Sequence, residues 1–161
     1  MEIKAAVLAV IAALEAEQIP YMLVGSFSSN FYGIPRSTAD GDLVIDIGSR
    51  SLAGLRQRLA APLRFDSQVT FENATGTLKN VVSVEGSSIQ VELFRLSGSP
   101  HDQERFRRRV SLPYLGRDVM LPTPEDVVIT KLNWLKLIAR GKDANDVRDV
   151  IAVQADDLDW P

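Results

Sequence analysis

Cysteine is absent from this chain of 161 residues, and histidine occurs once, as His101. The absence of cysteine excludes disulfides, zinc sites built on thiolates and thiol nucleophiles. A single histidine argues against a histidine-based metal site or catalytic triad. Any metal chemistry in this protein therefore has to depend on carboxylates, and the sequence contains 21 acidic residues.

The sequence also lacks a strong charge imbalance and a long apolar run. Its net charge of -3 gives no overall attraction to nucleic acid or anionic lipid. The N-terminal stretch matches neither a signal peptide nor a membrane span. We therefore expect a cytoplasmic protein with no membrane partner. The length, with 45% apolar and 24% charged residues, predicts a single domain over residues 1–161.

Hydrophobic periodicity and turn residues predict alternating helices and strands. A capping threonine, a proline and an acid at 123–126 mark one helix start clearly. The expected elements are a helix over 3–14, a strand over 21–24, a helix over 27–32, a strand over 40–47, a helix over 51–63, strands over 79–84 and 88–96, a hairpin of 107–112 with 117–121, and helices over 124–140 and 143–153.

The main chemical pattern is a pair of acids, Asp40 and Asp42, at the start of the predicted strand 40–47. Because side chains alternate along a strand, both acids project to one side, where they can bridge divalent cations. Mg²⁺ prefers such oxygen ligands together with substrate phosphates. Taken alone, two acids around a glycine are more often a solvated turn, so that alternative stays open.

A Gly25-Ser26 turn lies between the predicted strand 21–24 and the following helix. A helix that begins at this turn presents free backbone N–H groups and the positive end of its dipole. Such a helix start can hold a triphosphate beside metals bound to the acid pair. The hydroxyl of Ser26 adds a further hydrogen-bond donor.

These motifs, Val24-Gly25-Ser26 and the run from Tyr32 to Val44, resemble the DNA polymerase β-like nucleotidyltransferase superfamily. The resemblance is closest to small bacterial members, the minimal nucleotidyltransferases and the AbiEii-type toxins of toxin–antitoxin pairs. Their pattern is a Gly-Gly or Gly-Ser turn, a Gly-x-x-Arg-x-Thr segment, here 33–38, and Asp-x-Asp. The resemblance implies an α/β (α+β) fold, with a mixed central β-sheet and flanking helices.

The same resemblance implies a reaction and its cofactors. An acceptor oxygen would attack the α-phosphate of a nucleoside triphosphate, with two Mg²⁺ ions stabilising the transition state. The family needs a third carboxylate on a later strand, and Glu92 is the candidate. Aspartate is usual there, and Gly41 stands where a bulky apolar residue is usual. Glu92 could instead be an ordinary outward acid on an edge strand.

Two cationic residues and a later pair of acids bear on nucleotide binding. Lys131 falls on the inward side of the predicted helix 124–140, with Val128, Leu132, Leu135 and Ile138, and resembles the triphosphate-binding lysine of the AbiEii-type proteins. It could instead extend its stem along the helix edge into solvent. Arg36 precedes the acid pair, where it could contact phosphate or pair with an aspartate. Asp143 and Asp146 could support the site, although helix capping or ion pairs with Arg140 or Lys142 explain them equally well.

Two other features have plainer interpretations. Arg105 and Arg107–Arg109 form the only dense basic run, a weak nucleic-acid signature for which a solvated face is the simpler explanation. Trp134 is interpreted as a packing residue of the predicted helix 124–140.

The leading hypothesis is a Mg²⁺-dependent nucleotidyltransferase that acts on a hydroxyl of RNA (tRNA included), protein or a small molecule. It could be the toxin of a toxin–antitoxin pair, with an antitoxin partner. The alternative is a non-catalytic nucleotide-binding or interaction module that retains the fold. A further possibility is a catalytic core whose acceptor binds to a partner or to another segment.

Overall fold

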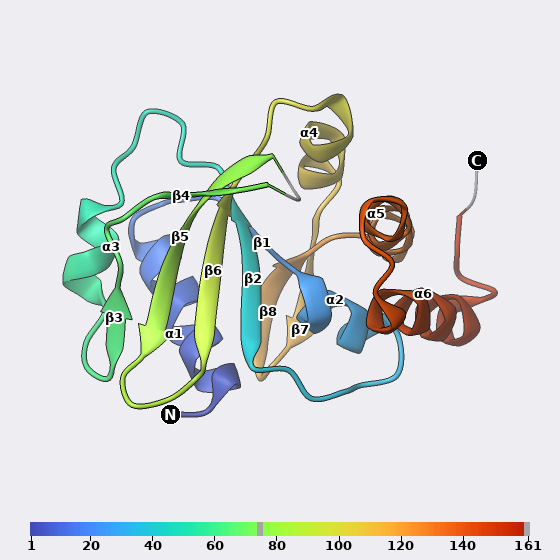
Figure 1. Ribbon diagram of the computed structural model, residues 1–161, viewed down its shortest axis with the longest axis horizontal. Helices are drawn as coiled ribbons and strands as arrows, with labels where there is room; N and C mark the ends of the chain where they lie inside the picture. The colour runs from blue at the N-terminus through green and yellow to red at the C-terminus, as the bar shows by residue number, and fades with distance from the viewer. Residues whose placement is uncertain (74–75, 160–161) are drawn as a thin grey trace.

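The computed structural model describes residues 1–73 and 76–159, and a mixed β-sheet lies at its centre (Figure 1). Its strands follow the order β1-β2-β6-β5-β3, with β4 also paired to β5, and β7 and β8 form a separate hairpin. Among the strands of the described residues, only β2 and β6 pair in parallel. The strands are β1 (Tyr21–Val24), β2 (Asp40–Ile45), β3 (Leu63–Phe65), β4 (Thr70–Glu72), β5 (Thr77–Val84), β6 (Gln90–Arg95), β7 (Val110–Tyr114) and β8 (Arg117–Leu121).

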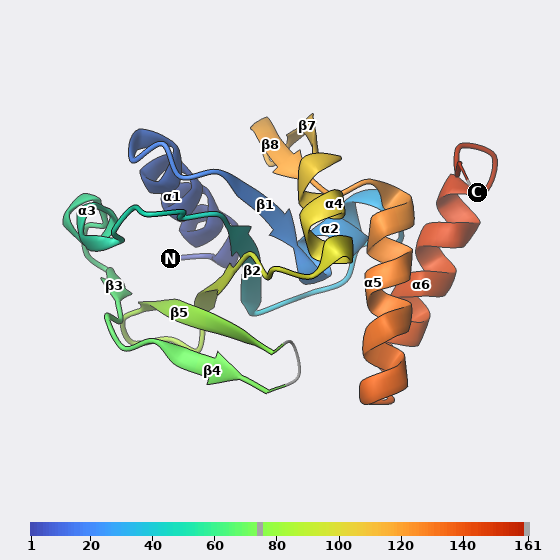
Figure 2. The same cartoon turned by 90° about the horizontal axis from the view of Figure 1, so that it is seen from above.

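Helices surround this sheet, which confirms the predicted α/β fold with a mixed central sheet. In Figures 1 and 2, α5 and α6 lie side by side beyond α2, at the end of the molecule opposite α3 and β3. In the described part of the chain, no helix is both long and apolar enough to cross a membrane. The helices are α1 (Ile3–Ala16), α2 (Gly25–Tyr32), α3 (Ala53–Arg58), α4 (Pro100–Arg107), α5 (Pro124–Leu137) and α6 (Gly141–Gln154).

The main hydrophobic core lies between α1 and one face of the sheet. Val7 and Ile11 of α1 are fully buried there, against Leu43 of β2 and Leu93 of β6. Because side chains alternate along β2, residues 40, 42 and 44 point to the opposite face. A smaller cluster of Met22, Val44 and Phe106 covers part of that face. The acid pair is therefore placed beside this smaller cluster and away from the main core.

Gly41 lies where α1 packs against β2. A Cβ atom on Gly41 would overlap a methyl group of Val7. In the family that the sequence resembles, a bulky apolar residue is usual at this position, whereas the structure gives this glycine a packing role. Without a side chain, the strand lets α1 lie directly on its backbone.

The predicted helix 51–63 is wrong in its second half. Helix α3 ends at Arg58, and Leu63 belongs to β3, where it pairs with Val84 of β5. Proline at 62 cannot continue a helix and disfavours helical backbone in the residue before it. The strands β3 and β4 were not predicted, because three residues each are too few to show an alternating pattern.

Other boundaries also differ from the prediction. Residues 100–107 form α4, a helix that was not predicted and that includes residue 107 of the predicted hairpin. The side chain of Ser99 caps this helix by accepting a hydrogen bond from the Asp102 N–H. Strand β2 ends at Ile45, before Asp46 and Ile47. Helix α5 ends at Leu137, and Gly141 begins α6 instead of ending α5.

Candidate active site

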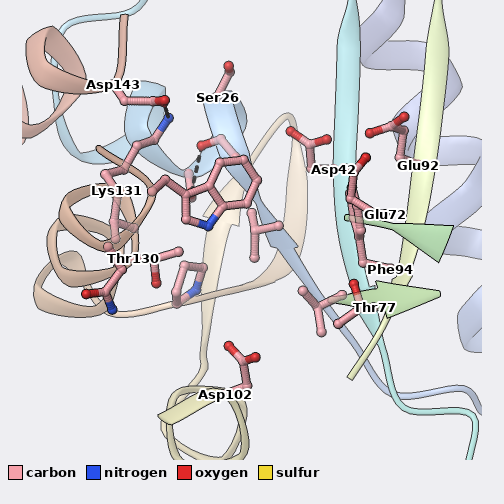
Figure 3. Close-up of a pocket in the computed structure, with 18 of the residues that line it drawn as sticks. Ser26, Asp42, Glu72, Thr77, Glu92, Phe94, Asp102, Thr130, Lys131 and Asp143 are labelled. Carbon is pink, nitrogen blue, oxygen red and sulfur yellow. Dashed lines mark hydrogen bonds and ion pairs between the residues drawn. The ribbon is translucent and has the colours of Figure 1, made fainter. Parts of the chain in front are cut away.

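A cavity of about 750 Å³ opens between the sheet and the helices α2, α5 and α6. It is lined by residues from segments far apart in the sequence. Figure 3 shows Asp42 and Glu92 side by side on one wall, Lys131 and Asp143 on the opposite wall, and Ser26 between them. The structure brings every predicted site residue to this one cavity: Gly25, Ser26, Arg36, Asp40, Asp42, Glu92 and Lys131.

The acid wall follows from the register of two parallel strands. Asp42 of β2 is the direct partner of Glu92 of β6, and Asp40 lies two residues earlier on the same face of the sheet. Strand β6 lies between β2 and β5, so the interpretation of Glu92 as an edge-strand acid is wrong. Asp40 is exposed, but Asp42 is partly buried within the strand, so a simple solvated turn is also wrong for Asp42.

The electrostatic environment of Asp42 penalises its negative charge. Burial, followed by the charges of Glu92 and Asp40, raises the pKa of Asp42 to about 6. The positive charges of Lys131 and Lys142 oppose this effect only in part. A divalent cation at this wall would relieve the repulsion among the carboxylates.

Glu92 is already engaged by a cation that the sequence analysis did not identify. Lys79 of β5 places its Nζ 2.7 Å from Glu92 Oε1 and 3.1 Å from Glu72 Oε2. Residues 85–87 predict an antiparallel hairpin of these two strands, but the contact depends on the exact β5–β6 register, which the prediction did not give. Glu72, like Glu92, lines the cavity.

The donor set fits Mg²⁺ in its chemistry, because hard cations prefer carboxylate oxygens. Across residues 1–73 and 76–159, however, no three acidic or histidine side chains converge closely enough to hold a metal ion. Metal binding by Asp40, Asp42 and Glu92 therefore stays a prediction, and one oxygen of the Glu92 carboxylate already contacts Lys79. Two bound Mg²⁺ ions remain a prediction.

The start of α2 lies directly against Asp42. Gly25 is the first residue of α2 and has a φ of +63°, a conformation that glycine adopts without strain. A Cβ atom on Gly25 would overlap the carboxylate of Asp42. Glycine at this position thus lets the N-terminus of α2 approach the acid wall, and the helix begins two residues earlier than predicted.

Arg36 spans the space between α2 and α6. Its Nε and Nη2 atoms donate to the two carboxylate oxygens of Asp146, each at 2.8 Å, and Nη2 also donates to Ser26 Oγ at 2.9 Å. The sequence left open whether Arg36 meets phosphate or an aspartate, and the partner found here is Asp146. Burial opposes the ionisation of Asp146, but hydrogen bonds from Arg36 and Lys131 outweigh it and lower its pKa to about 2.

Lys131 joins the same network from α5. Its Nζ lies 2.7 Å from Asp146 Oδ2 and 3.0 Å from Asp143 Oδ1. The side chain of Lys131 is only 12% exposed, so extension into solvent along the helix edge is wrong. Asp143 also pairs with Arg140 at 3.0 Å and does not cap α6, whose N-cap residue is Arg140. The two aspartates thus hold Lys131 and Arg36 in fixed positions at the cavity.

The predicted inward face of α5 is correct for Val128, which is fully buried, but wrong for Leu132 and Ile138, which are 44% and 47% exposed. Phe94, Arg95 and Thr130 also line the cavity and were not predicted. They lie on β6 and α5, where no sequence pattern distinguishes them from ordinary structural residues.

The arginine run is not a uniformly solvated face. Arg105 is buried and pairs with Asp102, and Arg108 pairs with Asp126 at 2.6 Å. Arg109 lies over the ring of Phe106. The side chain of Arg107 is 72% exposed, and that of Arg108 is 41% exposed. Arg105, through Thr130, and Arg108, through Asp126, therefore link α4 to α5.

Comparison with known proteins identifies this arrangement at the level of the fold. No protein-family model and no curated protein matches the sequence. Among solved structures, the antibiotic-resistance factor ANT(2'')-Ia is similar over 92% of this chain and 82% of its own, with a TM-score of 0.64 and 11% identity. An antigenic nucleotidyltransferase-like protein from Paracoccidioides brasiliensis is similar over 96% and 76%, with a TM-score of 0.60 and 23% identity.

The lincosamide antibiotic adenylyltransferase LnuA, solved with lincomycin bound, is similar over 91% of this chain and 95% of its own, with a TM-score of 0.57 and 12% identity. All three likenesses are below 25% identity and extend over most of each chain. The chain therefore has the nucleotidyltransferase fold.

Proposed function

We propose that this protein is a nucleotidyltransferase that transfers a nucleoside monophosphate from a nucleoside triphosphate to a hydroxyl acceptor. One observation carries the proposal: the N-terminus of α2 at Gly25 lies directly against Asp42, within a cavity that also holds Lys131. An anion-binding helix start beside paired acids suits a metal-bound triphosphate. The nucleotidyltransferase fold supports the same conclusion.

Each side chain has a role in this proposal. The N–H groups at the start of α2 and the hydroxyl of Ser26 would bind triphosphate oxygens. Arg36 and Lys131 would place their positive charges beside the same oxygens, from positions fixed by Asp146. Holding the triphosphate and the acceptor together in one geometry accounts for much of the rate enhancement in such reactions.

The acid wall would act at the α-phosphate. Asp40, Asp42 and Glu92 would hold a divalent cation, which would supply Lewis-acid stabilisation and would lower the pKa of the acceptor hydroxyl. The acceptor oxygen forms a bond to the α-phosphorus, the bond to the bridging oxygen breaks, and pyrophosphate leaves. The acceptor proton passes to a carboxylate of this wall or to water.

The acceptor class is the finer part of the proposal. LnuA is described as an antibiotic adenylyltransferase, and ANT(2'')-Ia has been solved with adenylyl-2''-tobramycin. These names favour a small-molecule hydroxyl, whereas the resemblance to AbiEii-type toxins favours RNA or protein. A toxin role and an antitoxin partner would follow only from the second case.

A second candidate function is a nucleotide-binding or interaction module without catalysis. The observation that favours it is the ion pair between Lys79 and Glu92, which occupies the third carboxylate. In such a module the cavity would bind nucleotide, but Lys79 would keep Glu92 away from any metal.

The test incubates purified protein with Mg²⁺, a cell extract and each nucleoside triphosphate, labelled at either the α- or the γ-phosphate. RNA, protein and small-molecule fractions are then counted separately. We expect label from the α-phosphate alone to enter one fraction, and Asp42→Asn to abolish the transfer. Asp118→Asn, an exposed acid on β8, is the matched control. Binding without transfer of any label would favour the non-catalytic module.

Expression in a bacterial host separates the acceptor classes further. Growth arrest that Asp42→Asn relieves would support a toxin role. Normal growth with label on a small molecule would contradict it.

A further inference from the structure

Helix α5 presents more than Lys131 to the cavity. Trp134 follows Lys131 by three residues, which places it on the same side of the helix and about 4.5 Å further along its axis. Trp134, Leu137 and Ile138 all line the cavity. Leu137 and Ile138 are 68% and 47% exposed, so the cavity has an apolar wall beside its cationic one.

Trp134 does not have the packing role that its sequence position indicated. Among the described residues, it belongs to none of the three hydrophobic clusters. Its side chain is partly exposed. A tryptophan that lines a cavity without joining a core is available to a ligand.

A chain of contacts fixes the indole relative to the phosphate-binding side chains. The guanidinium of Arg140 lies 5.0 Å from the centre of the Trp134 ring. Arg140 pairs with Asp143, and Asp143 pairs with Lys131. The ring is therefore held near Lys131 by the same ion pairs that position that lysine.

We propose that Trp134 binds the base of the nucleoside triphosphate by stacking, with Leu137 and Ile138 completing the apolar wall. This inference rests on the proposed function, since it assigns the base subsite of the same cavity. With the triphosphate held at Ser26 and Lys131, the apolar wall offers a surface that suits a flat π-system on the same helix as Lys131. Stacking tolerates any base, so the subsite accepts purines and pyrimidines alike.

The experiment separates the base from the triphosphate. Calorimetry measures the binding of ATP and of inorganic tripolyphosphate, both with Mg²⁺, to the wild type, Trp134→Leu and Trp134→Phe. We expect Trp134→Leu to weaken ATP binding about 5- to 100-fold and to leave tripolyphosphate binding unchanged. Trp134→Phe, which keeps an aromatic ring, restores most of the loss. Unchanged tripolyphosphate binding also shows that each variant is folded.

The outcomes distinguish this inference from the proposed function. Equal ATP affinity in the wild type and Trp134→Leu, with tripolyphosphate still bound, overturns the base subsite alone and points to an acceptor on the apolar wall. If the wild type binds neither ligand, the proposed function fails with it.

A second readout follows the ring directly. The chain has two tryptophans, so Trp160→Phe leaves Trp134 as the only indole fluorophore. In that variant, ATP should change the emission, whereas tripolyphosphate should change it much less. Equal responses to both ligands would contradict stacking on Trp134.

Discussion

Replacing Asp42 with asparagine should stabilise the metal-free protein at alkaline pH. The fold raises the pKa of Asp42 from an ordinary 3.8 to about 6, mainly through burial and then through Glu92 and Asp40. This difference in pKa corresponds to about 3 kcal/mol in the free energy of unfolding. The value is an upper limit, because water reaches the carboxylate in part. The folded protein holds the proton of Asp42 more tightly than the unfolded chain does. This contribution to the stability of the wild type is therefore fully present below about pH 4 and is lost as the pH rises through about 6.

Asparagine keeps the shape of the side chain and never ionises, so its advantage should depend on pH. Urea unfolding with EDTA should show Asp42→Asn more stable than the wild type at pH 8, by up to about 3 kcal/mol. The advantage should vanish at pH 4. Asp118→Asn, an exposed control on β8, should change stability by no more than about 0.5 kcal/mol at either pH. An advantage of equal size at both pH values would refute the electrostatic reasoning and indicate a packing effect.

Three further predictions concern the backbone and the ion-pair network. Gly25→Ala should destabilise the protein more than Gly48→Ala in urea unfolding, because both have positive φ but only the Cβ at 25 would overlap another side chain; equal losses would contradict this. Gly41→Ala should cost about 1–3 kcal/mol, and less when combined with Val7→Ala in a double-mutant cycle, whereas strict additivity would exclude the predicted overlap. Asp146, whose pKa is lowered to about 2, should contribute on the order of 2 kcal/mol above pH 4 that is lost as the pH falls towards 2, and acid titration of Asp146→Asn should lack this component.

The parts of the fold that were predictable are those with strong local signals. The apolar run 21–24 predicts a buried strand that stops before Gly25, and β1 is that strand, although α2 begins at Gly25 without the predicted turn. The cap at Thr123 marks the start of α5 correctly, because its side chain accepts the Asp126 N–H. Both features depend on residues that are neighbours in the sequence.

The features that were missed depend on contacts between distant segments. Arg36 and Asp146 are separated by 110 positions, and nothing local indicates that α6 returns to the end of α2. The contact of Lys79 with Glu92 follows from the β5–β6 register, which a single sequence does not reveal. The sequence could therefore name Arg36 and Lys131 as cations of the site, but not the pairing of Arg36 with Asp146 or the contact of Lys79 with Glu92.

The central claim is that one cavity binds a nucleoside triphosphate through a metal held by its acid wall. Because the acceptor is unknown, the most direct measurement does not require it: calorimetric titration of a non-hydrolysable nucleoside triphosphate, with Mg²⁺ or with EDTA, into the wild type and Asp42→Asn. We predict binding at least about tenfold tighter with Mg²⁺ in the wild type, a difference of about 1.4 kcal/mol, and no such dependence in Asp42→Asn. Absence of binding, or equal binding with Mg²⁺ and EDTA, would contradict the account.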